Sequence, residues 1–167
     1  MSNTRSHYSL DDLAQEILSR IFVVLGAESA KDIVSARLSS NKMYEAGGDP
    51  QVYRTTCMDM FEGMGPKNLK ADLFIRTCAL HNNIEAIFRQ GIDECFCYGN
   101  FGLGLTLLRQ VAYEDHLEAI YLLGIIHISR GPHLCDEGLQ LLDAYFGWAV
   151  LDDGEYMGVV DSAKELL

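Results

Sequence analysis

A chain of 167 residues is long enough for one ordinary domain, or for a small module joined to a second one. Thirteen basic residues against twenty-four acidic residues give a formal net charge of -11, which repels nucleic-acid phosphates and anionic lipid headgroups. Hydrophobic residues make up 49% of the chain and charged residues 22%, as in folded globular proteins. We therefore expect a folded protein whose partners are neither nucleic acids nor membranes.

The chain contains no uninterrupted apolar run of about eighteen residues, and its opening, "MSNTRSHYS", is polar. These features predict a soluble protein that is not secreted. The five cysteines are odd in number and mostly flanked by apolar residues, which suits buried thiols in a reducing compartment. The expected location is the cytoplasm or the nucleus.

The first predicted helix lies in "SLDDLAQEILSRIF", with Ser9 as its N-cap. Its apolar residues recur at intervals of three and four, and so line one face: Leu10, Leu13, Ala14, Ile17, Leu18 and Ile21. With "FVVL" directly behind them, they exceed what so small a bundle can bury. We therefore expect an exposed apolar patch here that receives a partner helix.

Three further short helices are predicted before residue 61. One begins at Ser29, because Asp32 three residues later completes the spacing of a capping box. The next is stopped by Gly47 and Gly48. The last begins in "DPQVYR", where Pro50 takes the first helical position and the aspartate before it is the N-cap.

The stretch "EGMGPKN" separates two predicted modules, because two glycines and a proline in seven residues disfavour any regular element. This gives a first module over residues 1–61, a linker over 62–68 and a second module over 69–167. Strand patterns are nearly absent, so the predicted fold is all-α. Helices are expected in the second module near 69–80, 84–90, 102–112, 117–129, 135–145 and 158–166.

The second module contains two stretches of sequence that are repeated. The stretch "IEAIFRQGI" at 84–92 returns as "LEAIYLLGI" at 117–125, thirty-three residues later. In the same way "GLTLL" at 104–108 returns as "GLQLL" at 138–142, thirty-four residues later. Periods of about 34 residues are those of helix-turn-helix repeats, whose units bury their apolar faces by stacking on one another.

Small residues recur at the same interval. Ala86 and Gly91 in the first copy correspond to Ala119 and Gly124 in the second. Their separation of five residues places both near one side of a helix, where a larger side chain would force two crossing helices apart. We therefore expect a close helix crossing in each copy.

Residues 83–145 resemble the Sel-type subclass of tetratricopeptide-like repeats, through "EAIYLLG", "GLTLLRQVAYEDHLEA" and "GLQLL". In the first copy "RQG" stands where the subclass has a Leu-Gly pair. The resemblance implies an α–α superhelix of two to three repeat units.

The stretch "SLDDLAQEILSRIF…SAKDIVSARLSSNKMYEAGGDPQVYR", residues 9–54, resembles the F-box, in particular that of plant F-box proteins with Sel-type repeats. Where that family opens with Leu-Pro this chain has Ser9 and Leu10, and Met43 replaces a Trp or Phe. The resemblance implies a three-helix module that docks on a Skp-type adaptor of a cullin-RING ubiquitin ligase. It assigns the adaptor contacts to Leu10, Leu13, Ile17, Leu18, Ile21, Leu38 and Met43.

The same resemblance implies a substrate receptor that performs no catalysis and needs no cofactor. The repeats would hold a protein substrate through exposed polar and aromatic side chains, such as Arg89, Gln90, Tyr113, His116 and His127. A helical-repeat scaffold without ligase association remains an alternative, and so does an ordinary amphipathic core helix for "DLAQEILSRI".

Patterns for other chemistry are weak. Cys95 and Cys97 suggest zinc, but structural zinc sites prefer at least two residues between paired cysteines. Cys78 and His81 share a helical face, yet no glycine-rich oxyanion or phosphate loop accompanies them. "GNFGLG" follows no predicted strand, and "LDDGE" lacks the alternating oxygen ligands of a calcium loop. We expect neither a metal site nor a catalytic residue.

Overall fold

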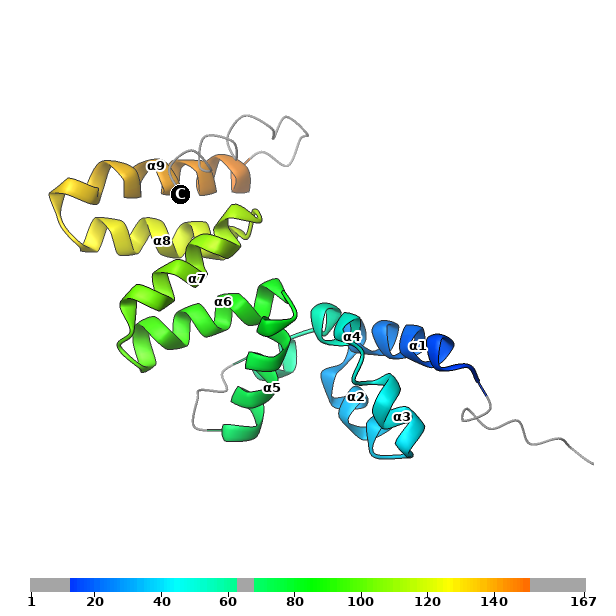
Figure 1. Cartoon of the computed structure of the whole chain (residues 1–167). Helices are drawn as coiled ribbons and strands as arrows, with labels where there is room; N and C mark the ends of the chain where they lie inside the picture. The colour runs from blue at the N-terminus through cyan, green and yellow to red at the C-terminus, as the bar shows by residue number, and fades with distance from the viewer. Residues whose placement is uncertain (1–12, 63–67, 151–167) are drawn as a thin grey trace, which may run out of the picture. The chain divides into compact units, whose positions relative to one another are not determined.

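The computed structural model describes residues 13–62 and 68–150, with side chains described to residue 147. Every regular element in these ranges is helical, which confirms the predicted all-α fold (Figure 1). Contacts divide the chain into two compact units, Met1–Glu85 and Ala86–Leu167. None of the described helices combines the length and the hydrophobicity needed to cross a bilayer. The predicted linker stays a prediction, since residues 63–67 lie outside the described ranges.

Short helices build the first unit: α1 Gln15–Glu28, α2 Ala30–Arg37, α3 Asn41–Ala46, α4 Pro50–Thr55, the 3-10 turn η2 Asp59–Phe61, and α5 Leu69–Leu80. Two predicted caps are confirmed. The Ser29 hydroxyl accepts from the backbone N–H of Asp32 at 3.3 Å. The Asp49 carboxylate accepts from the N–H of Gln51 at 2.9 Å, with Pro50 at the first helical position.

The start of α1 differs from the prediction. Ala14 is extended, with φ -63° and ψ 146°, so no continuous helix runs from the predicted N-cap, Ser9, into α1. The Leu13 carbonyl instead accepts a hydrogen bond from the ammonium group of Lys42, which removes it from the helical ladder. Ser9 itself lies outside the described residues.

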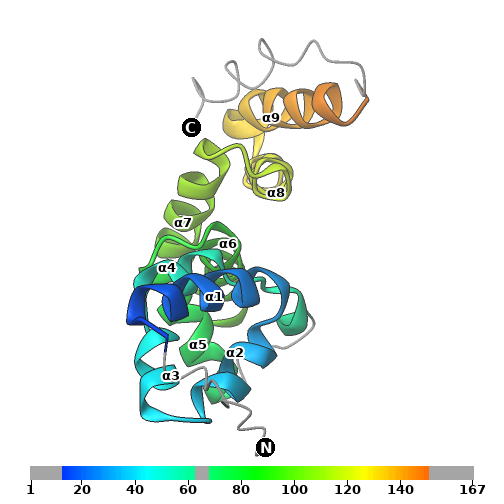
Figure 2. The ribbon, with the colours of Figure 1, turned by 90° about the vertical axis from the view of Figure 1, so that its right-hand side faces the viewer.

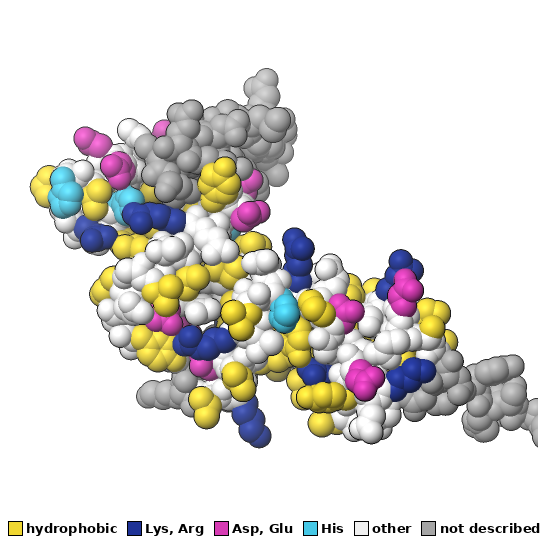
Figure 3. Space-filling model, viewed as in Figure 1, with side chains coloured by type: hydrophobic (Ala, Val, Ile, Leu, Met, Phe, Trp, Pro, Cys, Tyr) yellow, Lys and Arg dark blue, Asp and Glu magenta, His cyan; other side chains and the backbone are white. Residues whose placement is uncertain are grey.

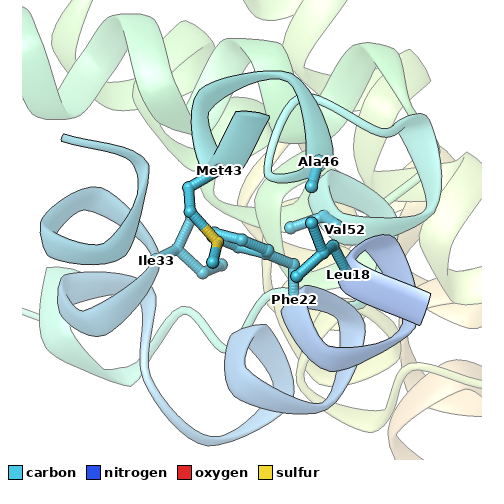
Figure 4. Close-up of a cluster of buried hydrophobic side chains, with 6 residues drawn as sticks. All are labelled: Leu18, Phe22, Ile33, Met43, Ala46 and Val52. Carbon is cyan, nitrogen blue, oxygen red and sulfur yellow. The ribbon is translucent and has the colours of Figure 1, made fainter. Parts of the chain in front are cut away.

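The core of the first unit is contributed by α1 to α4 (Figure 4). α1 turns Leu18 and Phe22 toward it, four residues apart on one face. The other helices close around this pair, and the buried cluster is Leu18, Phe22, Ile33, Met43, Ala46 and Val52. α1 packs against the other helices through the side that carries Leu18 and Phe22. Its outward side makes no contact within this cluster.

A polar network ties the turn after α5 to the end of α4. The Asn83 amide, which is 4% exposed, donates to the carbonyls of Tyr53 at 3.0 Å and Thr56 at 2.8 Å. The Tyr53 ring also stacks on His81, with ring centroids 5.1 Å apart, and its hydroxyl accepts from Arg37 at 2.7 Å. These contacts fix the end of α4 to α2 and to the turn after α5.

The second unit contains α6 Ile84–Ile92, which begins in the first unit, the π-helical turn η3 Asp93–Cys97, α7 Phe101–Tyr113, α8 Leu117–Ser129 and α9 Pro132–Val150. The predicted helix 117–129 matches α8, whereas α9 extends beyond the predicted 135–145 at both ends. In Figure 1 α8 and α9 lie side by side, and in Figure 2 α8 is viewed along its axis while α9 runs across it, so the two helices cross. The predicted helix 158–166 lies outside the described residues.

The predicted repeat is visible in the turns that precede α6 and α8. Asn82 and Asp115, thirty-three residues apart, both adopt the left-handed conformation, with φ 60° and 63°. The next residue in each turn, Asn83 or His116, donates its N–H to the carbonyl five residues earlier, at 3.1 and 3.2 Å. Asn and Asp tolerate this conformation better than most side chains, so sequence and geometry repeat together.

The predicted helix crossings are also confirmed. A Cβ atom on Gly104 of α7 would lie 2.9 Å from the carbonyl oxygen of Gly91 on α6. Likewise a Cβ atom on Gly138 of α9 would lie 2.7 Å from the carbonyl oxygen of Gly124 on α8. The opening glycines of "GLTLL" and "GLQLL" are thus the partners of the two predicted glycines, and each crossing brings backbone directly against backbone.

The other predicted small residues lie in the core of the second unit. Ala86 and Ala119 are both 0% exposed. They share this burial with Leu108, Leu123 and Leu141, one from each of α7, α8 and α9. The second unit therefore has a hydrophobic core of its own.

His127 is a polar exception within that core, because its side chain is 3% exposed and neither ring nitrogen has a hydrogen-bond partner. Burial and the positive charge of Arg109 on α7 lower the pKa of His127. Glu137 on α9, 3.6 Å from Nδ1, raises this pKa, and Arg130 at the end of α8 lowers it. The net direction is downward, so the neutral ring is favoured in the folded chain.

We predict that Gly104→Ala lowers the free energy of unfolding by about 1–3 kcal/mol, because the new methyl group must push two backbones apart. Gly102, two residues earlier in α7, has open space around its Cβ position, so Gly102→Ala serves as the matched control and should be neutral or stabilising. Urea denaturation followed by circular dichroism measures both. Equal midpoints for the two variants would contradict the crossing.

We also predict a histidine-dependent loss of stability in acid. The folded-state pKa of His127 lies below its unfolded value of about 6.5, so its contribution is full above that pH and is lost as the pH falls further. His127→Leu should therefore flatten the plot of unfolding free energy against pH below about pH 6.5. His133→Gln, at an exposed position, should leave the slope unchanged. Identical slopes for all three proteins would refute the assignment.

Candidate functional site

The outward face of α1 is an exposed apolar surface of the first unit. Ile17, Ile21 and Val24 are 48%, 43% and 67% exposed, and their spacing of four and three places them on one side of the helix. These three residues define the α1 face, which points away from the pair Leu18 and Phe22 that enters the core. An open hollow of ≈ 470 Å³ lies along it, and the described residues that line it are Ile17, Arg20, Ile21, Val24, Leu25 and Glu28.

The side chains of this face are mostly aliphatic, with charged residues at its border. Three large aliphatic side chains on successive turns remain in contact with water, and covering each one is worth roughly 1 kcal/mol or more. Arg20 and Glu28 border the apolar stripe with one charge of each sign. Such a stripe accepts the apolar face of a second helix and positions it through the flanking charges.

Three of the predicted adaptor contacts are exposed. Ile17 and Ile21 belong to the α1 face, and Leu38 at the end of α2 is 81% exposed. Their binding role stays a prediction. Val24 was not among the predicted contacts, although it continues the same face three residues after Ile21. Continuing the helical spacing of three and four residues beyond Ile21 would have identified Val24.

The remaining predicted contacts are placed differently. Leu18 and Met43 are 1% and 7% exposed within the core of the first unit. Leu13 is half-buried against the same core, and Leu10 lies outside the described residues. Periodicity identifies the apolar positions of a helix but does not tell which of them its own module covers. Substitution of Leu18 or Met43 would therefore act first on folding.

The predicted substrate contacts on the repeats are not equally accessible. Tyr113 is 59% exposed, whereas Arg89 and Gln90 are half-buried. The expectation that His127 is exposed is wrong, because the crossing of α8 and α9 buries it at 3% exposure. The sequence carries no signal for this burial, since His is found in cores and on surfaces alike.

His116 has a structural role as the N-cap of α8. Its Nδ1 accepts from the N–H of Ala119 at 3.3 Å, and its ring packs on Phe88 with centroids 4.4 Å apart. Only about a tenth of its side chain is exposed, so it offers little surface to a substrate. Its contribution is to orient the start of α8.

Three of the five cysteines have raised pKa values, which disfavours their reactive thiolate form. Burial raises the pKa of Cys78 to about 12, so its thiol stays protonated near neutral pH. Burial, and then the charge of Glu94, raise the pKa of Cys95. Desolvation and the adjacent carboxylate of Asp93 raise the pKa of Cys97. Among the residues that the structure describes, no group of three or more His, Cys, Asp or Glu side chains could hold a metal ion.

Named relatives of this chain occur in Arabidopsis thaliana. F-box protein At5g50450 is 25% identical over 158 residues, which cover 93% of this chain and 45% of the relative. At1g67623, named as a candidate F-box protein, is 27% identical over 143 residues, which cover 86% of this chain and 48% of the relative. The chain thus spans about half the length of these two curated relatives.

A third relative from the same plant, F-box protein At2g35280, is 25% identical over 122 residues, which cover 73% of this chain and 75% of the relative. The names of all three agree with the predicted resemblance to plant F-box proteins. No solved structure gives a significant match to the chain.

The family of plant tetratrico peptide repeats matches residues 51–147, which is more than half of the chain. The matched range contains the two repeated turns and both glycine crossings. The Sel-type subclass stays a prediction. By sequence match and by repeated geometry, the chain belongs to the plant tetratricopeptide repeat family.

Proposed function

We propose that the protein is the substrate-receptor subunit of a Skp-cullin-F-box ubiquitin ligase. It binds a Skp-type adaptor through the first unit and a protein substrate through the repeats. The names of its relatives support the proposal, because all three are F-box proteins. In this role the protein performs no catalysis, requires no cofactor and acts in the cytoplasm or nucleus.

The exposed stripe on α1 is the observation that carries this proposal. A module whose core is complete has no internal use for Ile17, Ile21 and Val24 in water. An adaptor helix laid along them would bury all three, and Leu38 extends the apolar surface of the same unit. The α1 face is therefore the expected docking surface for the adaptor.

The proposed division of labour explains how a protein without reactive groups promotes a reaction. Binding adaptor and substrate on one chain raises the effective concentration of substrate lysines near the ligase-bound ubiquitin. Weak contacts between the repeats and the substrate are then sufficient. The chemistry belongs to the other subunits of the ligase.

A helical-repeat scaffold without ligase association is the second candidate. The observation that favours it is the extent of the family match, which begins at residue 51 and leaves α1 to α3 outside. In that case the α1 face would contact a different protein. Direct measurement of adaptor binding separates the two candidates.

We predict that Ile21→Asp weakens binding to a Skp-type adaptor at least about tenfold, because a carboxylate would be buried in an apolar interface. Its folding should change little, since Ile21 is 43% exposed. Isothermal titration calorimetry with purified adaptor measures the binding, and thermal unfolding checks the fold. Leu73→Asp on α5, at a position 66% exposed, is the matched control and should bind like the wild type.

Leu38→Asp tests how far the surface extends, and we predict a smaller loss of about threefold to tenfold for this peripheral position. Wild-type protein that fails to bind the adaptor would favour the scaffold. Equal losses in Ile21→Asp and Leu73→Asp would show that the α1 face is not the docking surface.

A further inference from the structure

Negative charge is concentrated in the second half of the chain. Residues 86–167 hold four of the thirteen basic residues and thirteen of the twenty-four acidic residues, which leaves a formal charge of -9 there. The same counts leave -2 on residues 1–85. A partner of the second unit therefore meets a strongly negative field, whereas the first unit is almost neutral.

The outer face of α9 alternates acidic and apolar side chains. Asp136, Leu139, Asp143 and Phe146 follow one another at spacings of three, four and three, so they share one side of the helix. Leu139 and Phe146 are 53% and 52% exposed, and both aspartates are exposed. A large aliphatic and a large aromatic side chain thus stand in water between carboxylates.

The outer face of α8 continues this pattern. Glu118 and Tyr121 lie three residues apart, and the Glu118 side chain is 72% exposed while Tyr121 is 40% exposed. Tyr121 contacts Tyr145 of α9 with ring centroids 5.0 Å apart, and Tyr145 contacts Phe146 at 5.3 Å. Tyr145 thus connects Tyr121 of α8 with Phe146 of α9, and we define the α8–α9 patch as Glu118, Tyr121, Asp136, Leu139, Asp143 and Phe146.

Neither α8 nor α9 contains a Lys or Arg, although His116 lies 3.4 Å from Glu118 and Arg130 directly follows α8. In Figure 3 acidic and hydrophobic side chains of this unit stand beside Lys or Arg and His side chains. An apolar surface that also carries carboxylates selects a ligand by both properties at once. It favours a ligand with apolar groups and positive charge, and it repels acidic or nucleic-acid ligands.

We propose that the α8–α9 patch binds a protein segment in which Lys and Arg alternate with large apolar residues. This inference rests on the proposed function, where such a segment would be the recognition element of the substrate. Leu139, Phe146 and Tyr121 pack against the apolar residues, and the three carboxylates pair with the basic ones.

Other occupants fit the charge less well. A second copy of the chain would bring another unit of formal charge -9 against the first. Residues 151–167, "LDDGEYMGVVDSAKELL", contain five acidic residues and one lysine, so they also carry the same sign as the patch. A basic partner is the choice that gains from both the charge and the apolar surface.

The probe is a fluorescein-labelled synthetic peptide of about eighteen residues, in which pairs of Leu or Phe alternate with pairs of Lys or Arg. Its binding to the full chain is measured by fluorescence anisotropy. A second peptide replaces every basic residue by Glu. We expect the basic peptide to bind and the acidic one not to bind. Raising the salt from about 50 mM to about 300 mM should weaken binding, because exposed charges are screened.

Variants locate the contact. Asp136→Lys with Asp143→Lys should weaken binding of the basic peptide about tenfold, since two attractive pairs become repulsive. Glu45→Lys with Asp59→Lys changes the net charge equally in the first unit and should leave the affinity unchanged. Leu139→Ser with Phe146→Ser should also weaken binding about tenfold while the salt dependence persists.

Several outcomes would overturn the proposal. The first is that the basic peptide fails to bind, and the second is that both peptides bind equally well. The third is that the two charge-reversed variants lose the same amount of affinity for the basic peptide. Conversion of a dimer to a monomer by Leu139→Ser with Phe146→Ser would assign the patch to self-association instead. Adaptor affinity is measured for the same variants. If adaptor binding persists while peptide binding fails, only this inference falls, whereas loss of adaptor binding in the wild type removes the proposed function.

Discussion

Backbone contact between paired glycines is the constraint on which the repeat architecture depends. Gly91 meets Gly104 and Gly124 meets Gly138 so closely that a single methyl group on the second member of each pair would collide with a carbonyl oxygen. Close approach lets the core leucines of neighbouring helices interdigitate, and their burial supplies the favourable free energy. The crossings also bury His127 and leave the outer faces of α8 and α9 to solvent. Both the core and the exposed outer faces thus follow from the same contacts.

The first unit solves a different problem, because its helices are short and its core is small. α1 commits Leu18 and Phe22 to that core and keeps a second apolar face outside it. An ordinary amphipathic helix would carry polar residues on that outer face. The chain instead carries Ile17, Ile21 and Val24 there, so apolar residues lie on two sides of this helix. This separation lets a change in binding leave the fold intact.

Local signals predicted much of this structure, whereas packing decided the rest. The caps at Ser29 and Asp49 depend on neighbours in sequence, so their residue types suffice to place them. The burial of Met43 and His127 depends on which helices meet, and no short pattern encodes that. The π-helical turn at Asp93–Cys97 was missed for the same reason, since it accommodates the close passage of α7.

The paired glycines and the left-handed turns have a consequence for how such an array can grow. Both recur at an interval of 33 or 34 residues, so duplicating a block of that length copies a crossing and a turn together. A duplication of another length would place a side chain where bare backbone is required. Lengthening such an array by one stacked layer therefore requires about one full period of sequence, and the intervals of 33 and 34 residues show that one extra residue fits between two paired glycines.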